Sequence, residues 1–100
     1  MTNAQAQQLY RSILAVALSF KKPFTTEDFI RRFAVRYPRI WRGLIRTYGP
    51  WGKNAGRHYT AACRVADVLR SLSYRKRITK LRYTPASSIW GSPVIRMWRA

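Results

Sequence analysis

The stretch RHYTAACRVADVLRSLSYRKRITKLRY, Arg57 to Tyr83, decides the fold because its hydrophobic period changes partway along. From Arg57 to Ser73 the apolar residues share one helical face, within about 80° of one another at ~100° per residue. They are Ala61, Val65, Val68, Leu69 and Leu72. After the basic run YRKR, Tyr74 to Arg77, apolar and polar residues alternate as in a β-strand. The stretch therefore predicts a helix over residues 57–73 followed directly by a strand.

The other face of this helix is polar, which gives the helix a core side and a presented side. That face carries Thr60, Cys63, Asp67, Arg70 and Ser71, with Arg57 and Arg64 on one flank and Tyr59 on the other. Asp67 lies one turn from both Arg64 and Arg70, so we interpret it as a partner in a helix-surface ion pair. A contact between Asp67 and a base or a partner protein is the alternative.

The chain beyond the helix is typical of a β-hairpin. RITKLRYT is followed by the turn sequence PASSIWGSP and then by VIRMWR, which alternates again. In the second strand, Val94, Arg96 and Trp98 are expected on one face, with Ile95, Met97 and Arg99 on the other. The hairpin is predicted over residues 77–98.

Three helices are predicted before residue 50. The first runs from Ala4 to Phe20, with Asn3 or Thr2 as its cap and one buried stripe: Leu9, Ile13, Val16, Ala17 and Phe20. Leu14 and Leu18 form a smaller apolar strip on the other side of this helix. That strip fits packing against the C-terminal part of the chain, or alternatively a homodimer contact.

The second helix has strong boundary signals. Thr25 and Asp28 have the spacing of a capping box, Phe24 and Phe29 that of a hydrophobic staple, and Pro38 ends the helix. Its expected buried residues are Phe29, Ile30, Phe33 and Tyr37. A third short helix follows from Pro38 or Arg39 to Tyr48, with Ile40, Trp41, Leu44 and Ile45 facing inward.

The segment YGPWGKNAGR, Tyr48 to Arg57, is predicted to be a loop because it holds three of the five glycines. It lacks the terminal Gly-Lys-Ser/Thr of a nucleotide-binding loop. Trp41 and Trp98 are expected in the core. Trp51 and Trp90 lie in turn segments, where they either close a loop over the core or stack on nucleic-acid bases.

Composition indicates one folded domain with a polyanionic partner. The 100 residues are 47% hydrophobic, and 20 Lys and Arg against 3 Asp and Glu give a net charge of +17. The positive charges repel one another, and binding to a polyanion relieves this repulsion. Nucleic acid is the polyanionic partner that best fits this composition. Fifteen of the cations are arginines, whose planar fork matches phosphate and the guanine edge.

The sequence gives little support to predictions of catalysis, metal binding or a membrane-spanning segment. Three acids offer no carboxylate pair beyond Glu27 and Asp28, which fit the first turn of a helix. His58 and Cys63 are the sole residues of their types, so no zinc set, cofactor or catalytic nucleophile is predicted. No apolar run approaches the ~20 residues that span a bilayer. With no secretory signal and one cysteine, the expected location is the cytoplasm, or the nucleoid or nucleus if the protein is bound to DNA.

The order of elements resembles the winged helix-turn-helix superfamily, in which a recognition helix precedes a two-stranded wing. The resemblance is carried by FTTEDFIRRFAVRYP, by RVADVLRSLSYRKRITKLRY and by WGSPVIRMWR, which together cover most of the chain. The chain departs from that pattern by the insertion at residues 38–56, where the superfamily has a tight turn. The expected fold class is mainly α with a C-terminal β-hairpin, α+β, of winged-helix type.

The resemblance implies a helix at 57–73 in the major groove of double-stranded DNA and a basic wing on the adjacent backbone. It assigns base edges to Arg57, Tyr59, Thr60, Cys63 and Arg64, and phosphates to Lys53, Asn54, Arg75, Lys76, Arg77, Lys80 and Arg82. A second basic surface is expected on the middle helices: Arg31, Arg32, Arg36, Arg39, Arg42 and Arg46.

The sequence thus predicts a non-enzymatic DNA-binding protein, a transcriptional regulator or a DNA-associated accessory factor. Two alternatives stay open. One is an RNA-binding structural component of a ribonucleoprotein particle, which dense arginine on several faces favours. The other is a module that binds an acidic protein surface.

Overall fold

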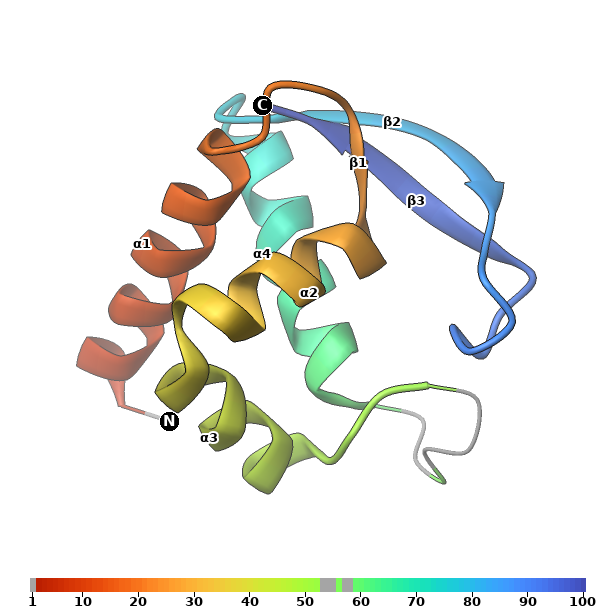
Figure 1. Cartoon of the computed structure of the whole chain (residues 1–100). Coiled ribbons are helices and arrows are strands. Elements are labelled where there is room, and N and C mark those ends of the chain that lie inside the picture. Colours follow the sequence, from red (N-terminus) through yellow and green to blue (C-terminus); the bar gives the residue numbers. More distant parts are fainter. Residues whose placement is uncertain (1, 53–55, 57–58) are drawn as a thin grey trace.

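The computed structural model describes residues 2–52, 56 and 59–100, and these form an α+β fold of four helices and a three-stranded antiparallel sheet. The elements follow in the order α1 (Asn3–Leu18), β1 (Phe24–Thr25), α2 (Thr26–Arg36), α3 (Pro38–Tyr48), α4 (Ala61–Tyr74), β2 (Thr79–Pro85) and β3 (Val94–Arg99). In Figure 1 the sheet lies above the helices, α3 lies at the opposite, lower end, and the hairpin tip extends to one side. The predicted fold class, helices followed by a C-terminal hairpin, is confirmed at this level.

Helix α1 begins at a capping box formed by Thr2 and Gln5, one residue before the predicted start. Its buried stripe is the predicted one up to Ala17, and the helix ends at Leu18. Phe20 lies just beyond that end and stacks on Phe24 with ring centroids 4.2 Å apart. Leu14 packs against the core of the same chain, whereas Leu18 is 52% exposed. The internal packing predicted for the second apolar strip therefore holds for Leu14 alone.

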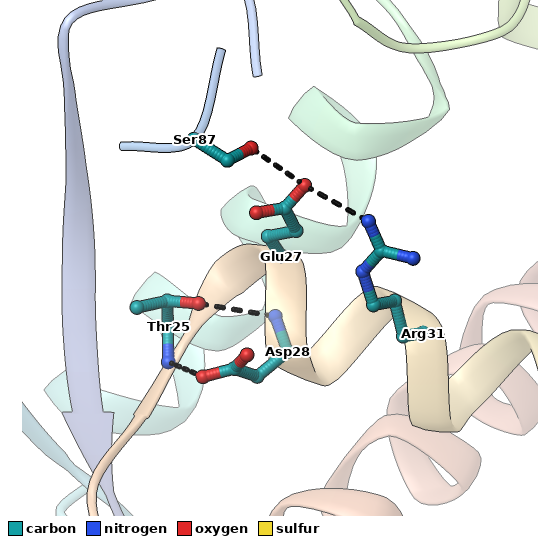
Figure 2. A network of polar contacts seen from close by, with 5 residues as sticks. All are labelled: Thr25, Glu27, Asp28, Arg31 and Ser87. Carbon is teal, nitrogen blue, oxygen red and sulfur yellow. Dashed lines mark hydrogen bonds and ion pairs between the residues drawn. The ribbon is translucent and has the colours of Figure 1, made fainter. Parts of the chain in front are cut away.

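Helix α2 has the predicted boundaries. The Thr25 side chain accepts a hydrogen bond from the Asp28 backbone N–H, and the Asp28 carboxylate accepts one from the Thr25 backbone N–H. Both are drawn in Figure 2. The ring centroids of Phe24 and Phe29 lie 6.0 Å apart, a distance suited to the predicted hydrophobic staple. Capping satisfies backbone donors that the first turn of a helix leaves unpaired. This local signal was therefore sufficient to predict where α2 begins.

The two-residue strand β1 was not predicted. Phe24 pairs with Trp98 and Thr25 with Met97, so β3 lies between β1 and β2 in the sheet. Two residues are too short to show an alternating pattern, and the partner lies more than seventy positions away. This pairing joins the start of α2 to the C-terminal strand.

Helix α4 begins at Ala61, so the prediction of a helix from Arg57 was wrong for Tyr59 and Thr60. The Thr60 side chain accepts a hydrogen bond from the Cys63 backbone N–H at 3.5 Å and caps the helix. A threonine whose oxygen binds the backbone N–H three residues on adopts an extended conformation, and the helix starts after it. The end at Tyr74 is one residue beyond the predicted Ser73.

The hairpin contains an irregularity that the strict alternation missed. Strands β2 and β3 pair from Thr79 opposite Arg99 to Pro85 opposite Val94, with a register shift between Lys80 and Tyr83. A shift of this kind is typical of a β-bulge, which bends the strand and re-aims its side chains. Ile95 and Trp98, which the alternation places on opposite faces of β3, are both buried, and of the two only Trp98 belongs to the main core cluster.

One buried cluster joins all four helices to the sheet, and it holds the two tryptophans expected in the core. Trp41 is 8% exposed and Trp98 is 2% exposed. The Trp98 indole N–H donates to the Thr26 hydroxyl at 2.9 Å, so the one polar atom of this side chain is satisfied inside the core. The sheet is thereby fixed against the first turn of α2.

Candidate nucleic-acid interface

The turn between α4 and β2 concentrates positive charge on the surface. Arg75, Lys76 and Arg77 are all exposed, and Tyr74 beside them is 80% exposed. Lys80 and Arg82 continue the basic run along β2 and are exposed as well. We call these five cations the junction cluster: Arg75, Lys76, Arg77, Lys80 and Arg82. Their side chains can reach phosphates, and the Tyr74 ring offers a stacking surface next to them.

The backbone of this turn is held in one conformation by the end of α4. The Arg77 N–H donates to the Leu72 carbonyl at 2.9 Å and the Lys76 N–H donates to the Ser73 carbonyl at 3.0 Å. These two bonds form a Schellman motif, whose left-handed position is occupied here by Lys76 with φ of 59°. Glycine is the usual residue at that position because other residues cost about 1–2 kcal/mol in this conformation. The chain therefore keeps a cation where local energetics favour glycine.

Arg75 is anchored on the first helix. Its guanidinium lies over the Tyr10 ring, 5.2 Å from the ring centre. An arginine stacked on an aromatic ring keeps its outer N–H groups available while its stem loses freedom. Tyr10 thus positions one member of the junction cluster.

A groove of about 190 Å³ separates α4 from the hairpin and lies beside Lys80. Ala66 and Arg70 line it from α4, and the hairpin contributes Tyr83, Trp90 and Arg96 among others. Arg96 is fixed there, because it donates to the Leu81 carbonyl at 2.8 Å and lies 3.8 Å from the centre of the Tyr83 ring. Arg70, Tyr83 and Arg96 were not among the residues predicted to contact nucleic acid. The placement of Arg96 on the same strand face as Trp98 was the signal that could have identified it.

The predicted base-contacting residues have different surroundings. Thr60 is 6% exposed and its oxygen is used by the helix cap, so the expectation that it faces base edges was wrong. Cys63 is half-buried and lies 3.6 Å from the Thr60 hydroxyl. Arg64 is half-buried on α4, and Tyr59 is 43% exposed. Lys53, Asn54 and Arg57, and His58 with them, lie outside the described residues.

Tyr59 belongs to a cluster with Asp67 and Arg70. Its phenol O–H donates to the Asp67 carboxylate, whose other oxygen lies 2.6 Å from Arg70 Nη1. The predicted ion pair of Asp67 is therefore formed with Arg70. Partial burial, which includes packing on Tyr48 at 5.5 Å, and then the Asp67 hydrogen bond and charge raise the pKa of Tyr59 to about 12, against an opposing effect of Arg64. Tyr59 stays a neutral donor held against α4.

The hairpin tip is tied to the body of the protein. Ser87 Oγ donates to Glu27 Oε2 at 3.1 Å, and Arg31 approaches the same oxygen at 3.4 Å, as Figure 2 shows. The Trp51 and Trp90 rings lie 5.5 Å apart, and both pack against the core. These contacts favour the interpretation that the two tryptophans close their segments over the core.

All three carboxylates of the chain are engaged within the protein. Asp28 caps α2, Glu27 binds Ser87 and Arg31, and Asp67 binds Tyr59 and Arg70. Across the part of the chain that the structure describes, no group of three potential metal ligands lies together. No helix within the described ranges is long and apolar enough to cross a membrane. The junction cluster therefore has no acidic side chain of its own protein to neutralise it.

The second basic surface divides into two parts. Arg31 pairs with Glu27, Arg32 lies over the Phe20 ring at 3.7 Å, and Arg36 approaches Tyr37 at 5.9 Å. Arg39, Arg42 and Arg46 on α3 are exposed and make no such contact with any residue that the structure describes. All six arginines predicted as one surface are exposed, and three of them also contact side chains of the protein.

No protein-family model, curated protein or solved structure gives a significant match to this chain.

Proposed function

We propose that this chain is a non-enzymatic double-stranded DNA-binding protein of winged-helix type, a regulator or accessory factor. The observation that carries the proposal is the junction cluster: five exposed cations, without acidic partners, where helix α4 passes into a β-hairpin. A helix fits the major groove and a hairpin at its end can follow the adjacent backbone. Lys80 lines the groove between α4 and the hairpin, and the other four cations lie on the adjoining turn and on β2, so the cluster is suited to phosphates of a backbone that runs past the end of α4.

The division of roles follows from the contacts of each side chain. Exposed Lys76, Arg77 and Arg82 hold phosphates, and Arg75 does so from its platform on Tyr10. Base contacts fall to Arg64 in the first turn of α4 and to Tyr59, two residues before the helix begins. Thr60 has no part in reading because it caps the helix.

Fluorescence anisotropy with a duplex at several salt concentrations tests the proposal. Five phosphates neutralised by the junction cluster give a log-log slope of about −4.5, so affinity falls roughly 500-fold between 50 and 200 mM salt. Replacing Arg77 with Gln reduces the slope by about 0.9 on any sequence. Replacing Arg64 with Gln weakens a selected site more than random DNA. Micromolar or weaker binding at 50 mM salt contradicts the proposal.

Binding to structured RNA is the second candidate, and the outward arginines of α3 favour it, because an RNA that folds back on itself contacts several faces. Titration of the complex of protein and labelled duplex with unlabelled structured RNA, both counted as phosphate, separates the two. Release of the duplex by a much lower phosphate concentration of RNA supports RNA as the natural partner.

A further inference from the structure

The exposed face of α3 carries a row of three arginines, which we call the α3 row: Arg39, Arg42 and Arg46. Their spacing places them within about 60° of one another and along about 10 Å of the helix axis. Arg39 lies in the first turn, where the helix dipole disfavours a cation. Arg46 lies in the last turn, where the dipole favours a cation, so the row gathers its charge mainly against mutual repulsion, and each acid of the chain is engaged elsewhere.

Gly43 lies between these arginines and leaves the backbone bare. A Cβ at this position would meet nothing within 4 Å, so packing inside the protein does not require glycine. In a helix interior, glycine lowers helix stability by about 1 kcal/mol relative to alanine, and only proline lowers it more. Gly43 lines a groove of about 400 Å³ between α1 and α3, which has polar residues (Gln5, Gln8, Arg39, Thr47) and apolar ones (Leu9, Ile40, Leu44) along its walls. A basic row beside an open groove leaves room for the sugar-phosphate backbone of a nucleic acid.

The α3 row and the junction cluster lie at opposite ends of the molecule. In Figure 1 α3 lies at the lower end, and the turn between α4 and β2 lies at the upper end. The buried side chains of α3, Trp41 and Leu44, are on the side of the helix opposite the row, and Trp41 packs on Phe33 of α2. The row therefore points away from the body that carries the hairpin. The longest dimension of the protein is 35 Å, whereas a DNA duplex is stiff over about 150 base pairs. An unbent duplex that lies on the junction cluster therefore does not curve around the protein to reach the α3 row.

We infer that the α3 row is a second binding site for a DNA duplex, so that one monomer bridges two duplex segments. This inference rests on the proposed function, because the junction cluster must hold the first duplex. The ligand of the row is the phosphate backbone of the second duplex, recognised without regard to its sequence.

A capture assay tests the bridge. A duplex is fixed to beads, and the protein is added at a concentration where light scattering shows a monomer. A fluorescent second duplex is then added. The protein retains the second duplex, and the triple variant Arg39→Gln, Arg42→Gln, Arg46→Gln binds it about 500-fold more weakly at 0.1 M salt, since three phosphate contacts are lost. Its affinity for a single duplex, measured by anisotropy, changes less than 3-fold.

A charge-matched variant separates the site from net charge. Arg11→Gln, Lys21→Gln, Lys22→Gln removes the same charge from exposed positions outside both surfaces. It retains capture within 3-fold of the original protein, and circular dichroism and thermal unfolding establish that both variants are folded.

Each other outcome overturns the inference. If the protein binds one duplex and captures no second, the bridge is wrong and the proposed function stands. If it binds no duplex, both are wrong. If the α3 variant captures as well as the original protein, or capture appears only where a dimer forms, the row is not the second site.

Discussion

Lys76 occupies a left-handed backbone position that favours glycine, so its replacement by Gly separates stability from binding. The Schellman motif at the end of α4 keeps the same two hydrogen bonds with glycine, because both involve backbone atoms alone. With φ at 59°, relief of the left-handed strain contributes about 1–2 kcal/mol. The added freedom of glycine in the unfolded chain offsets about 0.4–1 kcal/mol of that gain. The net expectation is a stabilisation of about 0.5–1 kcal/mol, or a Tm increase of about 4 °C.

The same change removes one cation of the junction cluster. At 0.1 M salt the loss of one phosphate contact weakens duplex binding about 8-fold, and the log-log salt slope becomes shallower by about 0.9. The Lys76→Gly variant is therefore expected to be more stable and to bind more weakly. Locally unfavourable residues of this kind are often found at functional sites, which is consistent with the proposed phosphate contact of Lys76.

Thermal unfolding and anisotropy on the same preparations provide the two measurements. Lys76→Ala is the matched control, because it loses the charge and keeps the strained backbone. It should bind as weakly as Lys76→Gly and gain no comparable stability. Lys76→Arg should keep the affinity. The reasoning is refuted if Lys76→Gly lowers the Tm, or if its affinity and salt slope equal those of the original protein.

Three further predictions concern the supports of the interface. Trp98→Phe leaves the buried Thr26 hydroxyl without its donor and opens a void, so the free energy of unfolding falls by about 2–4 kcal/mol. Denaturant titration should show that the same change lowers this free energy by less in a Thr26→Val background, where the hydrogen bond is already absent. The stability that the raised pKa of Tyr59 contributes is fully present below pH 10 and is lost as pH rises toward about 12. The difference in unfolding free energy between the original protein and Tyr59→Phe should therefore disappear over that window, and an unchanged difference would contradict the assignment. Ser87→Ala removes the hydrogen bond to Glu27, so hydrogen exchange over residues 86–93 should become faster while the global Tm shifts by a few degrees at most; equal exchange would show that the contact does not hold the tip.

Several elements of this protein were predictable because their signals are local. Capping needs a side chain and a backbone N–H three residues apart, so the start of α2 at Thr25 and Asp28 was visible in the sequence. Pro38 marked the join of α2 and α3, and the change of period after Tyr74 marked the hairpin. The junction cluster was predicted for the same reason, since YRKR falls at the place where a helix becomes a strand.

The start of α4 shows how a local signal can be misjudged. The helical pattern extends back to Arg57, yet Thr60 has the chemistry of a cap, and its hydroxyl competes for the Cys63 N–H. Hydrophobic period shows which face of a helix is buried and gives little information on where the helix begins. One predicted base contact, Thr60, was lost for this reason.

The sequence by itself determined the helices, the hairpin, the charge and the place where that charge gathers, because each depends on residues within a few positions of one another. Only the tertiary structure decided that β1 pairs with β3, that Trp51 meets Trp90, and that Arg96 is fixed over Tyr83 beside the groove. It also decided that the α3 row and the junction cluster lie at opposite ends of the molecule. These relations depend on how distant segments pack around a shared core, and packing is set by the shape and volume of all its members together.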